Sequence, residues 1–225
     1  MACTPARFDV VAFDLDGTLA DTAPDLAAAL NHALGALGRR DVPADEVRQF
    51  IGQGARALLW RALAATGAVS EALVDQGFPI FLDFYAANIA RGTRAYPGME
   101  AALDRLAAQG TALAICTNKL ESLTHQLIEA LGWQGRFAAV VGGDTLRVRK
   151  PDPAPLHEAI ARAGGGRAAF VGDSITDADT ARAAGIRFVA VGFGFSDRPI
   201  AELGADEVIL GYRDLVPALE RIARA

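Results

Sequence analysis

The sequence predicts an α/β fold, in which a doubly wound parallel-sheet (Rossmann-like) core carries an inserted all-helical cap domain. Two observations predict the core: short apolar runs that end abruptly in polar residues, and helical stretches that alternate with these runs. A third observation predicts the insertion, because residues 21–92 carry helical patterns but no clear strand run. We therefore expect residues 1–20 and 93–225 to form the α/β core and residues 21–92 to form the cap.

The expected strands of the core are short runs of aliphatic and aromatic residues. Continuous apolar runs of this length suit strands of a parallel sheet that is covered by helices on both faces. The runs occupy residues 10–13, 112–116, 139–141, 168–171, 188–191 and 208–210.

The expected helices of the core lie between these strands, and each is closed by a glycine that can adopt the left-handed conformation of a helix C-cap. They occupy residues 100–109, 122–131, 153–163 and 176–184, ahead of Gly110, Gly132, Gly164 and Gly185. Strand, helix and strand in repeated order predict right-handed crossovers, with ligands bound at the carboxyl ends of the strands.

The cap is expected to begin with a helix whose start has a capping pattern. Thr22 with Asp25 three positions later, and Pro24 between them, resembles a capped helix start. Further helical stretches are expected at residues 44–51, 55–66 and 70–91.

The composition excludes several classes of partner. The chain has 225 residues, with 52% hydrophobic and 22% charged, which is ordinary for a soluble protein with a core. Its net charge is -5 and no basic cluster is present, so we expect no nucleic-acid partner. No apolar run approaches the roughly 20 residues of a membrane span, and no signal peptide is evident. We expect a cytoplasmic protein without a membrane partner, and the sequence leaves the oligomeric state open.

Asp14 and Asp16 directly follow the first expected strand. Two residues apart in an extended backbone, they project to the same side, and such crowding is costly unless a cation or a shared proton relieves it. Mg²⁺ prefers oxygen ligands and leaves positions for substrate phosphate. The pair therefore predicts a phosphate site in which one carboxylate attacks and the other shuttles a proton. The alternative is an ordinary turn, because Asp16 precedes Gly17 and Asp-Gly is common in turns.

Two further motifs can bind phosphate. Thr117 and Asn118 follow the strand expected at residues 112–116, where a hydroxyl and backbone N–H groups can hold phosphate oxygens. Thr117 could instead cap a helix. Lys150 stands next to Pro151 ahead of an expected helix, where it can place a point charge against a phosphoryl group. A solvated lysine is the alternative.

The fourth motif follows the strand expected at residues 168–171. Asp173 lies one glycine past that strand and would be a metal ligand if the strand neighbours the one that ends at Asp14. Asp177 lies one helical turn later and could support the metal through water or hydrogen bonds. An exposed helix position is the alternative for Asp177.

Taken in order, these four motifs resemble those of the haloacid-dehalogenase superfamily, and the resemblance covers essentially the whole chain. It implies an Mg²⁺-dependent phosphatase that works through an aspartyl-phosphate, with Asp14 as the nucleophile and Asp16 as the general acid/base. It also implies that Thr117 and Lys150 bind phosphate. Asp14, the Asp16 carbonyl and Asp173 would hold Mg²⁺.

Segments of the cap resemble bacterial phosphoglycolate phosphatases, notably residues 21–26 and 50–55. The resemblance implies a small phosphorylated metabolite as substrate, 2-phosphoglycolate, with Gly52 and Gln53 facing it and Arg56 reaching its carboxylate. A solvated Arg56 after a helix–helix turn is the alternative.

Other activities stay open on the same motifs. Similar capped proteins act on sugar phosphates, amino-sugar phosphates, nucleotides or pyrophosphate, and one branch is phosphoglucomutase-like. A regulatory or binding protein on the same fold is the alternative from a different class.

Overall fold

The core of the molecule is a six-stranded parallel sheet with strand order β5-β4-β1-β6-β7-β8. The computed structural model describes residues 7–196 and 198–224. All six expected strands form, and β1 lies in the middle of the sheet between β4 and β6. Their bounds are β1 Val10–Phe13, β4 Ala112–Cys116, β5 Ala139–Val141, β6 Ala168–Gly172, β7 Arg187–Val191 and β8 Glu207–Ile209.

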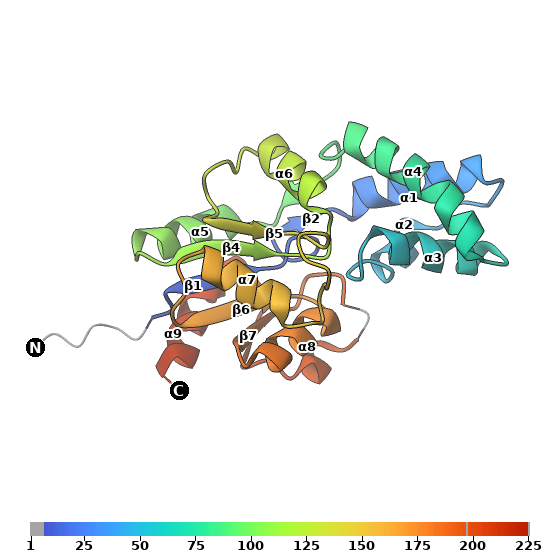
Figure 1. Ribbon diagram of the computed structural model, residues 1–225. Helices are drawn as coiled ribbons and strands as arrows, with labels where there is room; N and C mark the ends of the chain where they lie inside the picture. The colour runs from blue at the N-terminus through green and yellow to red at the C-terminus, as the bar shows by residue number, and fades with distance from the viewer. Residues whose placement is uncertain (1–6, 197, 225) are drawn as a thin grey trace, which may run out of the picture.

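Helices cover both faces of this sheet (Figure 1). One face packs against α7 and α8, and the opposite face packs against α5, α6 and α9. The bounds are α5 Met99–Ala108, α6 Glu121–Ala130, α7 Ala154–Arg162, α8 Ile175–Ala184 and α9 Leu215–Arg224, with short 3-10 helices at Ile200–Leu203 and Tyr212–Asp214. The predicted doubly wound α/β architecture is therefore confirmed.

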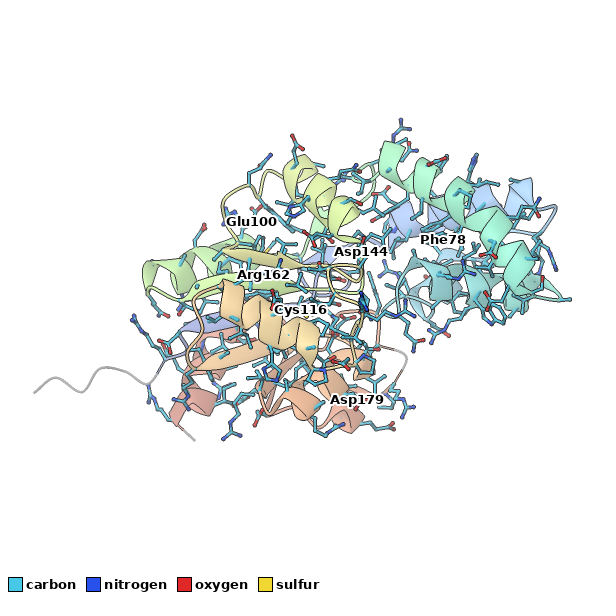
Figure 2. The ribbon with its side chains drawn as sticks, viewed as in Figure 1. Phe78, Glu100, Cys116, Asp144, Arg162 and Asp179 are labelled. Atoms are coloured by element: carbon cyan, nitrogen blue, oxygen red, sulfur yellow. The ribbon has the colours of Figure 1, made fainter. Side chains whose placement is uncertain are left out.

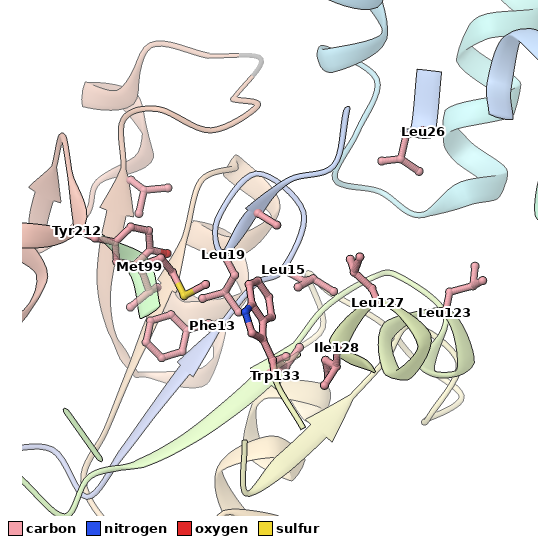
Figure 3. Close-up of a cluster of buried hydrophobic side chains, with 14 of the residues drawn as sticks. Phe13, Leu15, Leu19, Leu26, Met99, Leu123, Leu127, Ile128, Trp133 and Tyr212 are labelled. Carbon is pink, nitrogen blue, oxygen red and sulfur yellow. The ribbon is translucent and has the colours of Figure 1, made fainter. Parts of the chain in front are cut away.

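The buried strand β1 divides its side chains between the two faces, as the alternation of a strand requires. Val10 and Ala12 pack with the side chains of α7 and α8, whereas Val11 and Phe13 pack on the opposite face. Figure 3 shows the second cluster, in which Phe13 lies close to Met99, Trp133 and Tyr212. Asp14 thus directly follows β1, the fully buried central strand of the sheet.

Glycines end the core helices as expected. Gly110, Gly132, Gly164 and Gly185 all have positive φ angles, between 66 and 110°. The left-handed conformation costs glycine little, and it turns the chain from each helix toward the next strand.

The cap is a bundle of four helices beyond the carboxyl ends of the core strands (Figure 1). They are α1 Ala23–Ala36, α2 Ala44–Arg48, α3 Ala55–Thr66 and α4 Glu71–Ala87. Their apolar faces bury residues such as Leu30, Leu59 and Phe81, which form one continuous cluster with one face of the core.

A small antiparallel ribbon, β2 Ala20–Asp21 and β3 Arg94–Ala95, joins the cap to the core. The proposed boundaries of the cap, at residues 20/21 and 92/93, fall in or beside this ribbon. Two-residue strands leave no periodic pattern, so the sequence does not predict them.

The start of α1 differs from its expected capping. The Thr22 side chain makes no capping hydrogen bond, and Asp21 Oδ1 accepts from the Ala23 N–H instead. Asp25 turns to the returning chain, where its carboxylate accepts hydrogen bonds from Gly92 N–H, Thr93 N–H and the Thr93 hydroxyl at 2.7 to 3.0 Å. Asp25 therefore ties together the two segments that connect the cap to the core.

Among the described residues, no single helix is both long and apolar enough to cross a membrane. Only α3 and α4 together, bent by 118° at their junction, meet the criteria of length and composition.

Candidate active site

The site is built around Asp14, which the central strand β1 places among buried charged groups. Lys150 Nζ lies 2.9 Å from Asp14 Oδ1 and 2.6 Å from Asp177 Oδ1, and all three side chains are buried. The three residues come from segments that follow β1, β5 and β6, so the parallel sheet brings their ends together as expected.

Burial raises the pKa of Asp14 to about 6, because a carboxylate loses hydration there. Lys150 opposes this shift, while the nearby carboxylates of Asp177 and Asp16 add to it. Although burial alone would lower the pKa of Lys150, its contacts with Asp14 and Asp177 raise it above the ordinary value. Lys150 is therefore a permanent cation beside Asp14.

Asp173 lies at the end of β6 and is held by bonds to both of its oxygens. The Thr18 hydroxyl donates to Oδ1 at 2.9 Å, and the Phe195 N–H donates to Oδ2 at 2.6 Å. Burial, together with Asp177 and Asp14, raises the pKa of Asp173 well above its usual value.

Two glycines allow the close approach to Asp173. A Cβ atom on Gly17 would lie 2.4 Å from Asp173 Oδ2, and one on Gly194 would lie 2.3 Å from Asp173 Cβ. Only glycine fits either position. The role of Gly194, Thr18 and Phe195 does not follow from the four motifs, although Gly194 lies in the Gly-Phe-Gly segment after β7.

Asp177 has both oxygens engaged by protein groups. It forms a capping box at the start of α8 with Ser174, whose hydroxyl donates to Oδ2 at 2.6 Å, while Oδ1 accepts from Lys150. Its position is therefore suited to orienting Lys150.

The carboxylates of Asp14, Asp173 and Asp177 offer oxygen atoms that all lie within 4.8 Å of one another, a group that could hold a metal ion. The donor set fits Mg²⁺, because three buried carboxylates supply only hard oxygen ligands. Asp14 Oδ1 lies 2.9 Å from Lys150 Nζ, so a metal ion at this group would share the Asp14 carboxylate with Lys150. The Asp16 carboxylate is not in this group.

Thr117 and Asn118 follow β4 and connect the site to the cap. The Thr117 hydroxyl oxygen accepts from the Lys119 N–H at 3.3 Å, which leaves its own proton free to donate. The Asn118 amide donates to the carbonyl oxygens of Lys150 at 3.0 Å and of Gly52 in the cap at 3.1 Å.

The Asp16 carboxylate is paired with Lys119, which directly follows Thr117 and Asn118 but has no role expected from the sequence. Lys119 Nζ lies 2.8 and 3.1 Å from the two Asp16 oxygens, and its side chain is 4% exposed. Burial opposes the charge of Lys119, yet the attraction of Asp16 raises its pKa above the ordinary value.

A narrow cavity of about 30 Å³ lies between the core and the cap over Asp14 and Asp16. From the cap it is lined by Leu26, Ile51, Gly52, Gly54, Ala55 and Leu58, and from the core by Asp14, Asp16, Thr117, Asn118 and Lys119. Gly52 thus lies at this cavity.

Gln53 and Arg56 do not line this cavity. Gln53 is exposed, and α3 directs Arg56 toward α4, where its guanidinium lies 2.7 Å from Glu71 and 2.6 Å from Asp75. Arg56 is therefore directed away from the cavity and is paired with two acidic residues of α4.

Cys116, at the end of β4, lies inside the core (Figure 2). Burial raises its pKa to about 12, so this thiol stays neutral and unreactive next to Thr117.

These carboxylate, hydroxyl and lysine groups at the end of one parallel sheet define a hydrolase site. A family model described as haloacid dehalogenase-like hydrolase matches residues 11–191, and the chain belongs to this family. The resemblance predicted from the motifs is thereby confirmed.

Relatives within the family carry a more specific name. The chain is 48% identical to a phosphoglycolate phosphatase of Mesorhizobium japonicum, over 96% of this chain and 97% of the relative. It is 43% identical to a phosphoglycolate phosphatase of Agrobacterium fabrum, over 92% and 90%. A crystal structure described as a predicted phosphoglycolate phosphatase from Haemophilus somnus superposes with a TM-score of 0.88 at 30% identity, covering 96% of this chain and 99% of that one.

Proposed function

We propose that the protein is an Mg²⁺-dependent phosphomonoester hydrolase that forms an aspartyl-phosphate on Asp14 and acts on 2-phosphoglycolate, giving glycolate and phosphate. The observation that carries this proposal is the Asp14–Lys150–Asp177 arrangement beside Asp173, at the end of the central strand. The relatives named above support the choice of substrate.

Asp14 and Asp173 would hold Mg²⁺ with support from Asp177, and the family resemblance adds the Asp16 carbonyl as a ligand. When bound, Mg²⁺ supplies positive charge that neutralises the phosphoryl oxygens. Lys150 adds a fixed positive charge on the phosphoryl group. The Thr117 hydroxyl and the adjacent backbone N–H groups orient the remaining phosphoryl oxygens, and Asn118 holds the Lys150 segment in place.

The reaction has two steps. An Asp14 carboxylate oxygen attacks phosphorus, the bond from phosphorus to the ester oxygen breaks, and Asp16 gives its proton to the departing alkoxide. Asp16 then accepts a proton from water, whose oxygen attacks phosphorus and releases phosphate and the Asp14 carboxylate. The cap covers the cavity over Asp14 and Asp16 and excludes bulk water during both steps.

Phosphate release from 2-phosphoglycolate and from a panel of phosphomonoesters tests the proposal. We expect turnover with Mg²⁺ that is greatest on 2-phosphoglycolate, none with EDTA, and none after Asp14→Asn. Asp83→Asn is the matched control, because this carboxylate is exposed on α4, and it should retain full activity. Turnover that survives Asp14→Asn would contradict the mechanism, and a different best ester would contradict the substrate.

A further inference from the structure

Both lysines of the chain lie in the active site. Lys119 and Lys150 are the only lysines among its 22 basic residues, and both side chains are buried against carboxylates. Lys150 is used by the proposed mechanism, whereas Lys119 has no role in it. Burying a cation costs desolvation free energy, which its ion pair with a carboxylate only partly offsets.

Lys119 is held in a fixed position from two sides. Its ammonium contacts both Asp16 oxygens, and on another side it lies 4.6 Å from the centre of the Tyr85 ring of α4. Asp16 and the aromatic ring thus fix the position of the charge, and Lys119 is one of the residues that line the cavity. An ammonium has three N–H donors, so it can bind an acceptor in the cavity in addition to Asp16.

Lys119 lies beside Asp16, the residue that the proposed function assigns to the leaving alcohol. Lys150 and Thr117 lie around Asp14, where the phosphoryl group binds, whereas Asp16 must face the ester oxygen that leaves. A cation in contact with Asp16 therefore lies next to the leaving group. In a phosphate ester of a 2-hydroxy acid, the carboxylate carbon is separated from the ester oxygen by a single carbon atom, which brings the carboxylate to the same place.

We propose that Lys119 binds a second anionic group on the alcohol part of the substrate and thereby selects small phosphate esters that carry a carboxylate close to the ester oxygen. This inference rests on the proposed function. It assigns the recognition of the carboxylate to Lys119 of the core in place of Arg56, whose guanidinium is bound to two acidic residues of α4.

The test compares 2-phosphoglycolate with 2-hydroxyethyl phosphate, an ester of similar size that has a neutral hydroxymethyl group in place of the carboxylate. In the wild-type protein, kcat/KM should be higher for 2-phosphoglycolate. Lys119→Met should lower the ratio of the two kcat/KM values by about 10- to 100-fold, the usual value of a hydrogen bond to a charged group. Lys119→Arg, which keeps the charge, should restore part of the ratio.

Arg149→Met is the matched control, because Arg149 is an exposed cation close to the same cap loop and does not line the cavity. It should leave the ratio unchanged. An equal loss on both esters in Lys119→Met would overturn the inference while leaving the phosphatase proposal intact. No hydrolysis of either ester by the wild-type protein would instead overturn the proposed function.

A binding measurement needs no variant and covers the case in which Lys119→Met does not fold. The wild-type protein with Mg²⁺ is titrated calorimetrically with 3-phosphonopropionate and with propylphosphonate, which differ by the carboxylate and resist hydrolysis. We expect 3-phosphonopropionate to bind at least about tenfold more tightly. Equal affinities would overturn the inference.

Discussion

Three buried carboxylates, the partly buried Asp16 and two ammonium groups share the end of β1, and their charges decide what the site can bind. Lys150 balances part of the charge on Asp14 and Asp177, and Lys119 balances Asp16. Asp173 has hydrogen-bond donors but no cation partner among the described residues. The remaining excess of negative charge is that of two carboxylates, which a divalent cation would neutralise.

Protons and Mg²⁺ should therefore compete for Asp14. Its pKa of about 6 means that the carboxyl group takes up a proton as the pH falls through 6, and the protonated form is a poor metal ligand. We expect Mg²⁺ affinity, measured by calorimetry, to be weaker at pH 5 than at pH 7.5, because Asp14 takes up a proton as the pH falls through 6 and the raised pKa of Asp173 acts in the same direction. Asp14→Asn should bind Mg²⁺ more weakly and with a shallower pH dependence. An affinity that is the same at pH 5 and pH 7.5 would contradict this prediction.

Removal of the Lys150 charge should reduce stability as well as activity. Lys150→Met leaves Asp14 and Asp177 buried without their cation, and breaking a buried ion pair in this way costs about 3–5 kcal/mol. Urea denaturation without Mg²⁺ measures this loss in the free energy of unfolding. The double variant Lys150→Met/Asp177→Asn should recover part of the stability but no activity. If Lys150→Met is as stable as the wild-type protein, water must solvate the Asp14 and Asp177 carboxylates, and the prediction is wrong.

Between elements, the loop between α2 and α3 brings the cap into direct contact with the core. Gly54 has φ 88° and ψ 165°, a region that is essentially restricted to glycine. A Cβ atom there would lie 3.2 Å from the Asn118 carbonyl oxygen. The hydrogen bond from Asn118 to Gly52 depends on this close approach. The loop therefore closes the cavity only because it has no side chain at this position.

Gly54→Ala should thus favour an open cap. The strain in the closed arrangement is about 1–3 kcal/mol, so we expect kcat/KM for 2-phosphoglycolate to fall by roughly tenfold or more. Gly38→Ala is the control, because Gly38 also has a positive φ, 69°, but has open space around it. The control should lose some thermal stability and keep its kcat/KM. Equal kcat/KM values for both variants and the wild-type protein would contradict a role of this loop in closure.

The elements that the sequence predicts well are those with a local signal. The apolar runs of β1 and β6 are buried on both faces, so hydrophobicity alone identifies them, and the polar residue that ends each run locates the site. The ribbon of β2 and β3 is too short for any pattern, and α2 ends at Arg48 although the helical pattern extends to residue 51.

The predictions for single side chains fail where the direction of the side chain depends on its neighbours. Lys119 and Arg56 are both basic residues near motifs, and nothing in their local sequence separates them. Lys119 turns into the site because Asp16 and Tyr85 surround it, whereas Arg56 turns to α4 because Glu71 and Asp75 are nearby. Contacts of this kind join segments far apart in the chain, so no spacing pattern reports them.

At the scale of the whole molecule, the chain passes between core and cap twice, and Asp25 joins the two passages. Arg48 of the cap adds a second link, with Nη2 2.7 Å from Asp21 Oδ2 in β2 and the guanidinium 5.1 Å from the Phe195 ring. Phe195 in turn donates its N–H to Asp173. The cap is thus connected to the carboxylate cluster through Arg48 and Phe195.

Asp25→Ala should weaken the union of cap and core. The substitution leaves the N–H groups of Gly92 and Thr93 without an acceptor, at a cost of about 2 kcal/mol or more. We expect a lower midpoint of thermal unfolding and a broader transition, as the cap unfolds at a lower temperature than the core. Asp25→Asn keeps one acceptor oxygen, so its midpoint of thermal unfolding should lie between those of Asp25→Ala and the wild-type protein. A midpoint equal to that of the wild-type protein would show that the ribbon alone holds the passages together.

Because both lysines are buried, cleavage of the chain by a lysine-specific protease can measure how often the active-site region opens. A lysine-specific endoprotease has only two target bonds, after Lys119 and after Lys150, and the second leads into Pro151, which such proteases cut poorly. Cleavage should therefore occur at one bond, between Lys119 and Leu120, and only when β4 and α6 come apart around the active site. The rate of cleavage of the unlabelled, unmodified protein then measures how often this region opens, and any ligand that stabilises the closed site should slow it.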